Sequence, residues 1–301
     1  MADMHSTDPS NGGLTLAIIG CGTMGSAILA GVIKSFTRTQ SAGTEPRIKH
    51  FIATVNSLES EEALRTRFME SQDRLEVLHS DNASAMRSAD IILLACKPYM
   101  ADTVLKAEGV REAVEGKLII SVLVGSPVAK LESAIYHSGL RKKSEKPVYI
   151  KRVMLNIAAE LGESMSVIEV TSMPKHMEEI TDWIFLQVGK TAAVAPENFD
   201  IAGVTAGVSS AFLSVALDGI LDGAVSQGLK RADARKMVTQ SLLSLARLLE
   251  NGEHPAVLRE RCASPKGTTI DGLLSLEEDR ARYAFSKAVI ASSKRSHEIG
   301  N

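Results

Sequence analysis

The chain has few cysteines, few aromatic residues and no excess of either charge. Its three cysteines are odd in number and far apart, so they indicate neither a disulfide framework nor a metal site, and we expect a reducing compartment. Lysine and arginine number 34 against 36 acidic residues, which gives a net charge of −2. No basic run is interleaved with aromatic residues, and we therefore expect no nucleic-acid partner.

We also expect no segment that targets or anchors the protein. Residues 1–13 are polar, and no lysine or arginine precedes Lys34, which argues against a secretory signal and an arginine-rich presequence. No uninterrupted apolar run approaches the roughly 20 residues that a membrane helix needs. We therefore expect a cytoplasmic protein with no membrane partner. The 301 residues leave room for two domains.

The most informative stretch covers residues 14–31. An apolar run ends at Gly20, and the spacing Gly20-x-Gly22-x-x-Gly25 precedes a helical pattern of small residues. In a strand–turn–helix unit the first glycine makes the turn, the second lets backbone approach a pyrophosphate, and the third lets the helix pack on the strand. The helix amino terminus offers free N–H groups to the phosphates. These flanks favour a dinucleotide site over an ordinary turn, and its candidate residues are Gly20, Gly22, Thr23, Met24 and Gly25.

Apolar runs typical of buried parallel strands recur after this unit and alternate with helical patterns up to residue 195. Such alternation is typical of a doubly wound parallel sheet, whose ligands lie outside the carboxyl ends of the strands. From residue 196 onward only helical patterns follow. The sequence therefore predicts an α/β Rossmann-type doubly wound sheet over residues 14–195 that binds NAD(P), and an all-helical domain over residues 196–301. The expected strands cover 14–19, 48–55, 75–79, 91–96, 117–125, 148–154, 166–170 and 191–194, and the longer expected helices cover 101–114, 175–185, 208–228, 231–249, 254–262 and 270–299.

The helical pattern at 208–228 is long, apolar and rich in alanine, serine and glycine. Such a helix packs closely against another helix. Because the helical domain is small, we expect the partner helix to come from a second subunit, which predicts a homodimer or a higher homo-oligomer.

The end of the expected strand 48–55 bears on the choice of cofactor. NAD-binding folds place an acidic residue there for the ribose hydroxyls, and this chain has Asn56 and Ser57 instead. An acid would repel a 2′-phosphate, so its absence favours NADPH, with NADH possible because Glu59, Glu61 and Glu62 stand close by.

Three further stretches carry residues that suit a substrate. Residues 152–156 place an arginine and Asn156 at the end of a strand, where ligands bind. The alternative interpretation is that the arginine is a surface cation and the asparagine a turn residue. Residues 205–212 begin a helix with hydroxyls and glycine, which is also explained by capping and tight packing. Residues 263–270 form a Pro-Lys-Gly turn before two threonines, a nest of N–H groups suited to a carboxylate or an ordinary helix cap. The seven histidines show no ligand spacing, and we predict no metal site.

Taken together, these stretches resemble the pyrroline-5-carboxylate reductase family, which makes proline from a cyclic imine with NADPH or NADH. The resemblance covers residues 14–298. It rests on the glycine loop, on Asp81-Asn82, on Cys96-Lys97-Pro98, and above all on residues 252–255 followed by 264–270.

The resemblance implies roles for individual residues. In the family, backbone of a Ser-Pro-Gly-Gly-Thr-Thr loop holds the substrate carboxylate, and the second threonine points at the imine nitrogen. Carried over, Thr269 is the catalytic residue, and the substrate-binding candidates are Ser264, Lys266, Gly267, Thr268 and Asn156. The resemblance also places Asn82 at the adenosine ribose and makes Lys97 and Pro98 line the cofactor, so the cofactor candidates outside the glycine loop are Asn56, Ser57, Asn82, Lys97 and Pro98.

This chain departs from the family pattern near the substrate. Lys266 replaces the first glycine of the loop, Arg261 stands where an asparagine or glutamine is usual, and residues 207–212 are altered. The leading hypothesis is NADPH-dependent reduction of 1-pyrroline-5-carboxylate to proline. The alternatives are reduction of another cyclic imine acid, such as a piperideine or methylated pyrroline carboxylate, and a non-catalytic nucleotide-binding sensor.

Overall fold

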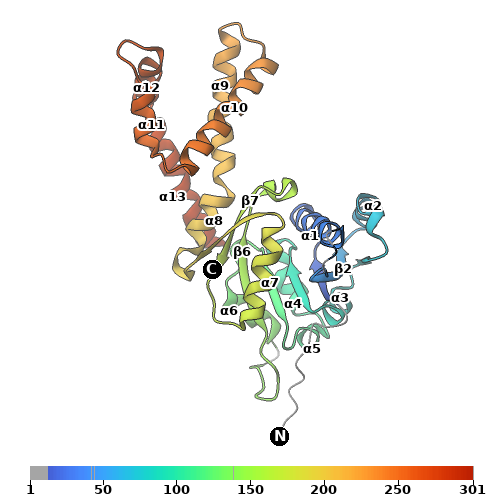
Figure 1. Cartoon of the computed structure of the whole chain (residues 1–301). Helices are drawn as coiled ribbons and strands as arrows, with labels where there is room; N and C mark the ends of the chain where they lie inside the picture. Colours follow the sequence, from blue (N-terminus) through green and yellow to red (C-terminus); the bar gives the residue numbers. More distant parts are fainter. Residues whose placement is uncertain (1–12, 42, 44, 138, 301) are drawn as a thin grey trace. The chain divides into compact units, whose positions relative to one another are not determined.

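The computed structural model describes residues 13–41, 43, 45–137 and 139–300. Residues 1–12, on which the expectation about targeting segments rests, lie outside this range. The chain divides into two compact units, of which the first runs to Gly207 and also includes the residues from Arg295 onward. The second unit covers Val208–Lys294. Figure 1 shows the elements of each.

The first unit is built on an eight-stranded sheet in the order β3-β2-β1-β4-β5-β6-β7-β8. β1 to β6 are parallel, whereas β7 runs antiparallel to β6 and β8 is parallel to β7. The predicted Rossmann-type sheet is confirmed, and the reversal follows from the short link between β6 and β7, because a parallel connection needs a dozen or more residues. The strands are β1 (Leu14–Ile19), β2 (Ile48–Val55), β3 (Leu75–His79), β4 (Ile91–Leu94), β5 (Leu118–Ser121), β6 (Tyr149–Met154), β7 (Ser164–Glu169) and β8 (Gly189–Val194).

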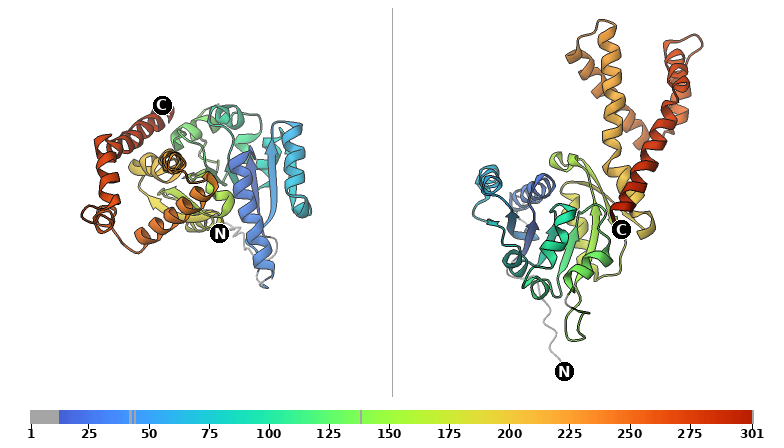
Figure 2. Two further views of the ribbon diagram at one scale, coloured as in Figure 1. Left: turned by 90° about the horizontal axis from the view of Figure 1, so that it is seen from above. Right: turned by 180° about the vertical axis from the view of Figure 1, so that it is seen from behind.

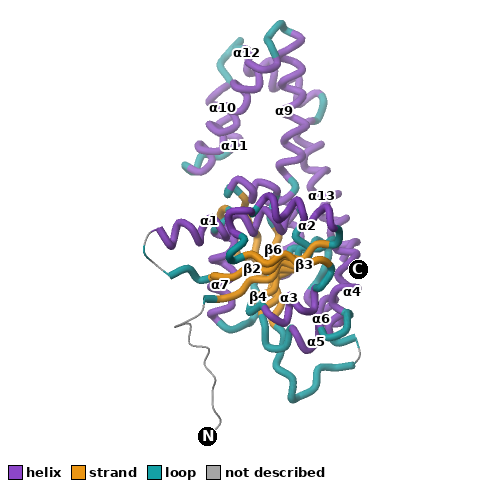
Figure 3. Tube along the Cα trace, turned by 90° about the vertical axis from the view of Figure 1, so that its right-hand side faces the viewer, coloured by secondary structure: helices purple, strands orange, loops and turns teal. Residues whose placement is uncertain are grey.

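The central strands are buried on both faces, which explains their continuous apolar runs. Successive side chains point to opposite faces, so Leu16 and Ile18 enter one core cluster while Ala17 and Ile19 enter another. Figure 3 shows α1 and α2 on one side of the sheet and α3, α5 and α6 on the other. The first cluster packs α1 (Thr23–Ser41), α2 (Leu58–Arg67) and α7 (Lys175–Leu186), and the second packs α3 (Asn82–Ser88), α4 (Ala101–Leu105), α5 (Val110–Ala113) and α6 (Val128–Ile135).

Two expected helices are each broken in the structure. The helix expected over 101–114 is α4 and α5, separated at Gly109, whose φ of +78° is a left-handed conformation that stops a helix. The helix expected over 270–299 is α12 (Thr268–Glu278) and α13 (Ala281–Gly300), separated at Arg280 with φ +54°. Among the described residues, four short 3₁₀ helices complete the elements: η1 (Met69–Ser71), η2 (Pro98–Met100), η3 (Ile157–Leu161) and η4 (Pro196–Asn198).

A third, smaller cluster lies where α8 (Phe199–Gly207) packs on β6 and β7. Phe199 is 1% exposed and packs with Met154 and Val167. The guanidinium of Arg152 lies 4.2 Å from the centroid of the Phe199 ring. A Cβ on Gly203 of the same helix would lie 2.3 Å from the Met154 sulfur, so any larger residue there would require the Met154 side chain to move.

The second unit is helical and is coloured from orange to red in Figure 2. It contains α9 (Ser209–Ser226), α10 (Arg231–Glu250), α11 (Pro255–Cys262), α12 and most of α13. Many of its large apolar side chains are exposed, and they include Leu213, Val215, Ile220, Met237 and Leu245. The helical stretch Pro196–Ser226 is long and apolar enough to cross a membrane by length and composition alone.

Candidate active site

The glycines of the turn after β1 differ in the space around them. Gly20 has a φ of +81°, and a Cβ there would lie 2.6 Å from the Cys96 Cα at the end of β4. A Cβ on Gly25 would lie 2.9 Å from the Ile18 Cγ2, so this glycine lets α1 approach β1. At Gly22, by contrast, a Cβ would meet no described atom within 4 Å. The protein itself therefore does not require a glycine at position 22, and the open space fits a ligand that approaches the backbone.

The predicted cofactor residues share one edge of the sheet. β1 lies between β2 and β4, so the chain order reverses at β1, and open α/β sheets bind ligands at such a point. The glycine turn follows β1, Asn56 and Ser57 follow β2, and Lys97 and Pro98 follow β4. Thr23 is exposed and Met24 half-buried in the first turn of α1, whose N–H groups face this edge. The edge can therefore hold an extended dinucleotide.

Asn82 is joined to the glycine turn through Thr54. The Thr54 hydroxyl donates to the Asn82 Oδ1 at 2.7 Å and accepts from the Gly20 N–H at 3.1 Å. The Thr54 carbonyl accepts from the Cys21 N–H at 2.7 Å. Asp81 caps α3 by accepting from the Ser84 N–H at 3.1 Å, which places Asn82 in the first turn of that helix.

The residues after β2 differ in what they do. The Ser57 hydroxyl caps α2 by accepting from the Ser60 N–H at 3.2 Å. Asn56 is exposed, with its Nδ2 3.8 Å from the Met100 sulfur. No acidic side chain stands at the strand end itself, although Glu59 and Glu61 occupy the first turn of α2. Lys97 and Pro98 are also exposed, and Pro98 begins η2.

Two cysteines of this region are not nucleophiles at neutral pH. Burial raises the pKa of the Cys21 thiol to about 12, although the nearby Arg67 guanidinium acts in the opposite direction. Burial likewise raises the pKa of Cys96 to about 11. Both thiols are therefore protonated near pH 7, and their role is packing around the glycine turn.

Arg67 ties the first turn of α1 to η3. Its Nη1 donates to the Ser26 hydroxyl at 3.1 Å, and its Nη2 pairs with Glu160 at 2.9 Å. Sequence reasoning missed both Arg67 and Thr54. The one available signal was a polar Thr54 inside an apolar strand, whereas nothing local marks Arg67.

Asn156 is the N-cap of η3, and both polar atoms of its side chain form hydrogen bonds with the protein backbone. Its Oδ1 accepts from the Ala158 N–H at 3.0 Å, and its Nδ2 donates to the Ala206 carbonyl at 2.9 Å. The structure thus gives Asn156 a capping role between η3 and α8. Its assignment as a substrate-binding residue stays a prediction.

Next to this segment lies a buried ionic group on β6, β7 and α8. The Arg152 guanidinium pairs with Glu169 at 3.1 Å and with Asp200 at 3.2 Å. The Glu169 Oε2 and the Arg152 Nε are buried and lack a hydrogen-bond partner among the described residues. Burial raises the pKa of Glu169 more than the attraction of Arg152 lowers it.

The candidate substrate loop belongs to the helical unit, between α11 and α12. The Gly267 N–H donates to the Ser264 carbonyl at 3.0 Å, and Lys266 has a φ of +57°. Pro265 at the second position and a positive φ at the third are the features of a type II turn. A Cβ on Gly267 would lie 2.4 Å from the Ser264 hydroxyl oxygen, so a larger residue there would require the Ser264 side chain to turn away.

The turn leads directly into α12, whose first residues are the two threonines. Gly267 is the N-cap, and Thr268 and Thr269 form the first turn with exposed side chains. In the part of the chain that the structure describes, neither threonine hydroxyl has a hydrogen-bond partner. Their backbone N–H groups and hydroxyls are therefore free for a ligand. Upstream, the His254 side chain caps α11 by accepting from the Ala256 N–H at 3.2 Å, as expected for a residue at a helix start.

No metal centre emerges from the described ranges: they hold no group of three or more His, Cys, Asp or Glu side chains that could bind a metal ion.

Comparison with known proteins gives this arrangement a family. Residues 196–299 match the family model for pyrroline-5-carboxylate reductase dimerisation, and residues 15–125 match the model for coenzyme F420-dependent NADP oxidoreductase. A pyrroline-5-carboxylate reductase of Lophium arboricola is 35% identical over 99% of this chain and 97% of its own length. The enzyme of that name from Neurospora crassa is 37% identical over 93% of this chain and 91% of its own length. The chain belongs to the pyrroline-5-carboxylate reductase family.

Solved structures of pyrroline-5-carboxylate reductases share the fold. The pyrroline carboxylate reductase of Plasmodium falciparum, crystallised with NADP bound, aligns with a TM-score of 0.78 at 24% identity, over 96% of this chain and 98% of its own. The enzyme of Streptococcus pyogenes aligns with a TM-score of 0.79 at 23% identity, over 95% of this chain and 99% of its own.

Proposed function

We propose that this protein reduces the C=N bond of 1-pyrroline-5-carboxylate to give proline, with NADPH as the hydride donor. The observation that carries the proposal is the glycine turn with open space over Gly22, in a chain more than 30% identical to named pyrroline-5-carboxylate reductases along nearly its full length. When bound, the nicotinamide ring supplies a hydride. Reduction then consumes one hydride at carbon and one proton at nitrogen.

The two units divide this work. The sheet domain, to which we assign residues 14–195 of the first unit, holds the cofactor through the glycine turn, Asn82 and the exposed Lys97 and Pro98. We place the 2′-phosphate beside Asn56 and Ser57, because no carboxylate stands at the end of β2 to repel it. We therefore expect a lower KM for NADPH than for NADH.

The helical domain, residues 196–301, supplies the substrate groups. The N–H groups at the start of α12 suit a carboxylate, because the positive end of the helix dipole lies there. The Lys266 ammonium adds a positive charge beside that turn. Thr269 donates its hydroxyl, which has no partner among the described residues, to the ring nitrogen.

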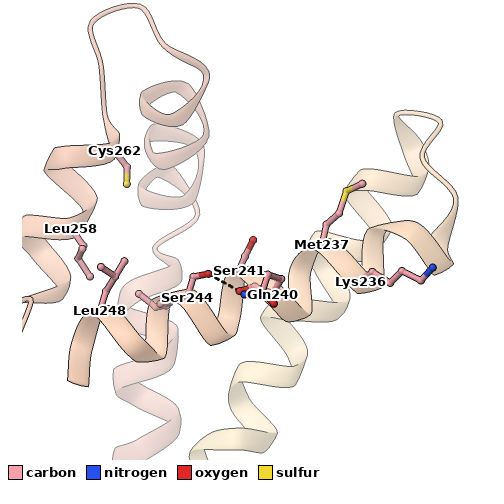
Figure 4. A pocket seen from close by; sticks show the side chains of 9 residues that line it. Lys236, Met237, Gln240, Ser241, Ser244, Leu248, Leu258 and Cys262 are labelled. Atoms are coloured by element: carbon pink, nitrogen blue, oxygen red, sulfur yellow. Dashed lines mark hydrogen bonds between the residues drawn. The ribbon is translucent and has the colours of Figure 1, made fainter. Parts of the chain in front are cut away.

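The exposed apolar helices of the same domain suit a second copy of the chain. A groove of about 640 Å³ lies along α10 and α11, with Met237, Leu248 and Leu258 among its lining residues. Figure 4 shows these side chains together with the Ser244 hydroxyl, which donates to the Gln240 carbonyl at 2.9 Å. We assign this apolar surface, including the stretch Pro196–Ser226, to a homodimer in the cytoplasm and not to a lipid bilayer.

The deciding experiment follows NADPH oxidation by the purified protein with 1-pyrroline-5-carboxylate and, in parallel, with the six-membered piperideine carboxylate. Thr269→Ala is expected to lower kcat roughly tenfold to a hundredfold with little change in NADPH affinity, since it removes one hydrogen bond to the reacting group. Ser275→Ala, which deletes an exposed hydroxyl two turns further along α12, serves as the matched control.

Each outcome has a definite meaning. If kcat/KM is higher for the piperideine carboxylate than for 1-pyrroline-5-carboxylate, the six-membered imine is the substrate instead. Tight NADPH binding without oxidation by either imine would indicate a nucleotide sensor, and equal kcat for the wild type and Thr269→Ala would remove the role of Thr269.

A further inference from the structure

Thr54 stands at the centre of the proposed cofactor site without being exposed to it. It is 1% exposed on β2 and is the polar member of an otherwise apolar buried strand end. Its hydroxyl contacts two different elements, the turn after β1 and the start of α3, at 3.1 Å and 2.7 Å. This buried hydroxyl forms hydrogen bonds with two candidate cofactor residues, Gly20 and Asn82, and packing alone does not explain that arrangement.

The hydrogen bonds of this hydroxyl determine how Asn82 is oriented. The hydroxyl oxygen accepts from Gly20, and Asn82 is the one acceptor that its own proton reaches among the described residues, so the Asn82 atom that faces this buried hydroxyl is Oδ1. The planar amide then directs its NH₂ group away from Thr54. Asn82 is half-buried, and its Nδ2 has no hydrogen-bond partner among the described residues. The structure thus presents two amide donors on the edge where the strands end.

We propose that Thr54 is a positioning residue for cofactor binding: its hydroxyl fixes the Asn82 amide with its NH₂ group toward the adenosine half of NADPH and holds the Gly20 turn in place. The inference rests on the proposed NADPH site and deepens it. The ribose hydroxyls and phosphate oxygens of a nucleotide are the acceptors that such an NH₂ group binds. Without the hydroxyl, the amide is free to turn by half a rotation and present Oδ1, which repels the phosphate oxygens because both are acceptors only.

The test compares Thr54→Val, which keeps the shape and removes the hydroxyl, with Thr54→Ser, which keeps the hydroxyl. We expect Thr54→Val to raise the KM for NADPH and the Kd for 2′,5′-ADP about tenfold, with kcat changed less than twofold, and Thr54→Ser to restore near wild-type values. Thr181→Val is the matched control, because Thr181 is also fully buried and donates to the Met177 carbonyl within α7, outside the proposed site.

A double-mutant cycle with Asn82→Ala shows whether Thr54 acts through Asn82. If it does, the two substitutions together raise the KM by clearly less than the product of their separate effects. A full product, or an unchanged KM in a folded Thr54→Val protein, would overturn the inference. Should Thr54→Val not fold, a Thr54→Ser protein whose KM equals that of Thr54→Ala would overturn it as well. Failure of the wild type to bind NADPH would instead overturn the proposed function.

Discussion

Glu169 and Arg152 form a buried ion pair, with Oε1 and Nη1 3.1 Å apart and side chains 6% and 9% exposed. Burial outweighs the attraction of the arginine, so the pKa of Glu169 lies above its ordinary value of 4.5. A carboxyl with a raised pKa in the folded state takes up its proton before the unfolded chain does. Its contribution to stability therefore grows as the pH falls from neutral toward about 4.5.

We predict that Glu169→Gln changes the free energy of unfolding by less than about 1 kcal/mol at pH 7, because burial penalises the Glu169 carboxylate more than Arg152 stabilises it, and the amide oxygen of glutamine still accepts a hydrogen bond from Arg152. The difference from the wild type should then increase between pH 7 and pH 5, since glutamine does not titrate. Urea denaturation of both proteins at the two pH values measures this. Glu145→Gln is a control without a slope over this range, because the hydrogen bond from Arg111 lowers the pKa of Glu145 and its contribution is lost mainly below pH 4.5. Equal slopes for all three proteins would contradict the prediction.

Gly20 and Gly22 allow stability to be separated from cofactor binding. An alanine at Gly22 meets no described atom within 4 Å, so Gly22→Ala should change the free energy of unfolding by less than about 0.5 kcal/mol. The same methyl group would stand where we place the pyrophosphate, and we expect the KM for NADPH to rise roughly tenfold to a hundredfold.

Gly20→Ala should lower the free energy of unfolding and have the smaller effect on the KM for NADPH. Its left-handed φ of +81° costs an L-residue about 1–2 kcal/mol, and the Cys96 backbone adds a clash. Thermal unfolding and KM measurements on both variants check the pair. A Gly22→Ala protein with wild-type KM would show that no phosphate approaches this backbone.

The glycine turn was predictable because its causes are local. An apolar strand, three glycines at fixed spacing and a following helix are adjacent in the sequence, and the steric demands at Gly20 and Gly25 are those that the spacing predicts. The parallel, doubly wound character of the sheet followed from the alternation of the patterns. The breaks at Gly109 and Arg280 were missed because a left-handed residue interrupts a helix without changing the apolar pattern around it.

The residues that support the site were not predictable in the same way. Thr54 and Asn82 are 28 positions apart, and Arg67 and Glu160 are 93 apart, so only the folded sheet brings each pair together. The sequence also places Asn156 in a candidate stretch, but it does not show that both ends of the side chain bind backbone. Long-range hydrogen bonds of this kind leave no periodic signal.

Lys266 departs from the glycine of the family pattern and offers a test of the substrate loop. Its φ of +57° costs about 1–2 kcal/mol in a lysine. A glycine relieves that cost but has more freedom in the unfolded chain, by about 0.4–1 kcal/mol. Lys266→Gly should therefore change stability little. We expect its KM for the imine acid to rise about threefold to fivefold, as for the loss of an exposed charge pair.

Two further variants isolate the charge of Lys266. Lys266→Asn keeps a residue that tolerates the left-handed conformation and should share the higher KM, whereas Lys266→Arg should retain the wild-type value. Steady-state kinetics with saturating NADPH measures all three. A lower KM in Lys266→Gly would mean that the lysine obstructs the N–H groups of the turn.

The exposed apolar face of α9 predicts how the protein assembles. Ile220 is 54% exposed in the middle of this helix, in a domain that matches the family model for dimerisation. If a second copy covers Ile220, then Ile220→Glu places an unpaired charge in the interface, which should raise the dissociation constant roughly a hundredfold or more. Sedimentation equilibrium over a range of concentrations measures this constant. Gln227→Glu, which adds the same charge at the exposed end of α9, is the control and should leave assembly unchanged. If Ile220→Glu assembles like the wild type, the contact between subunits lies on another face of the helical domain.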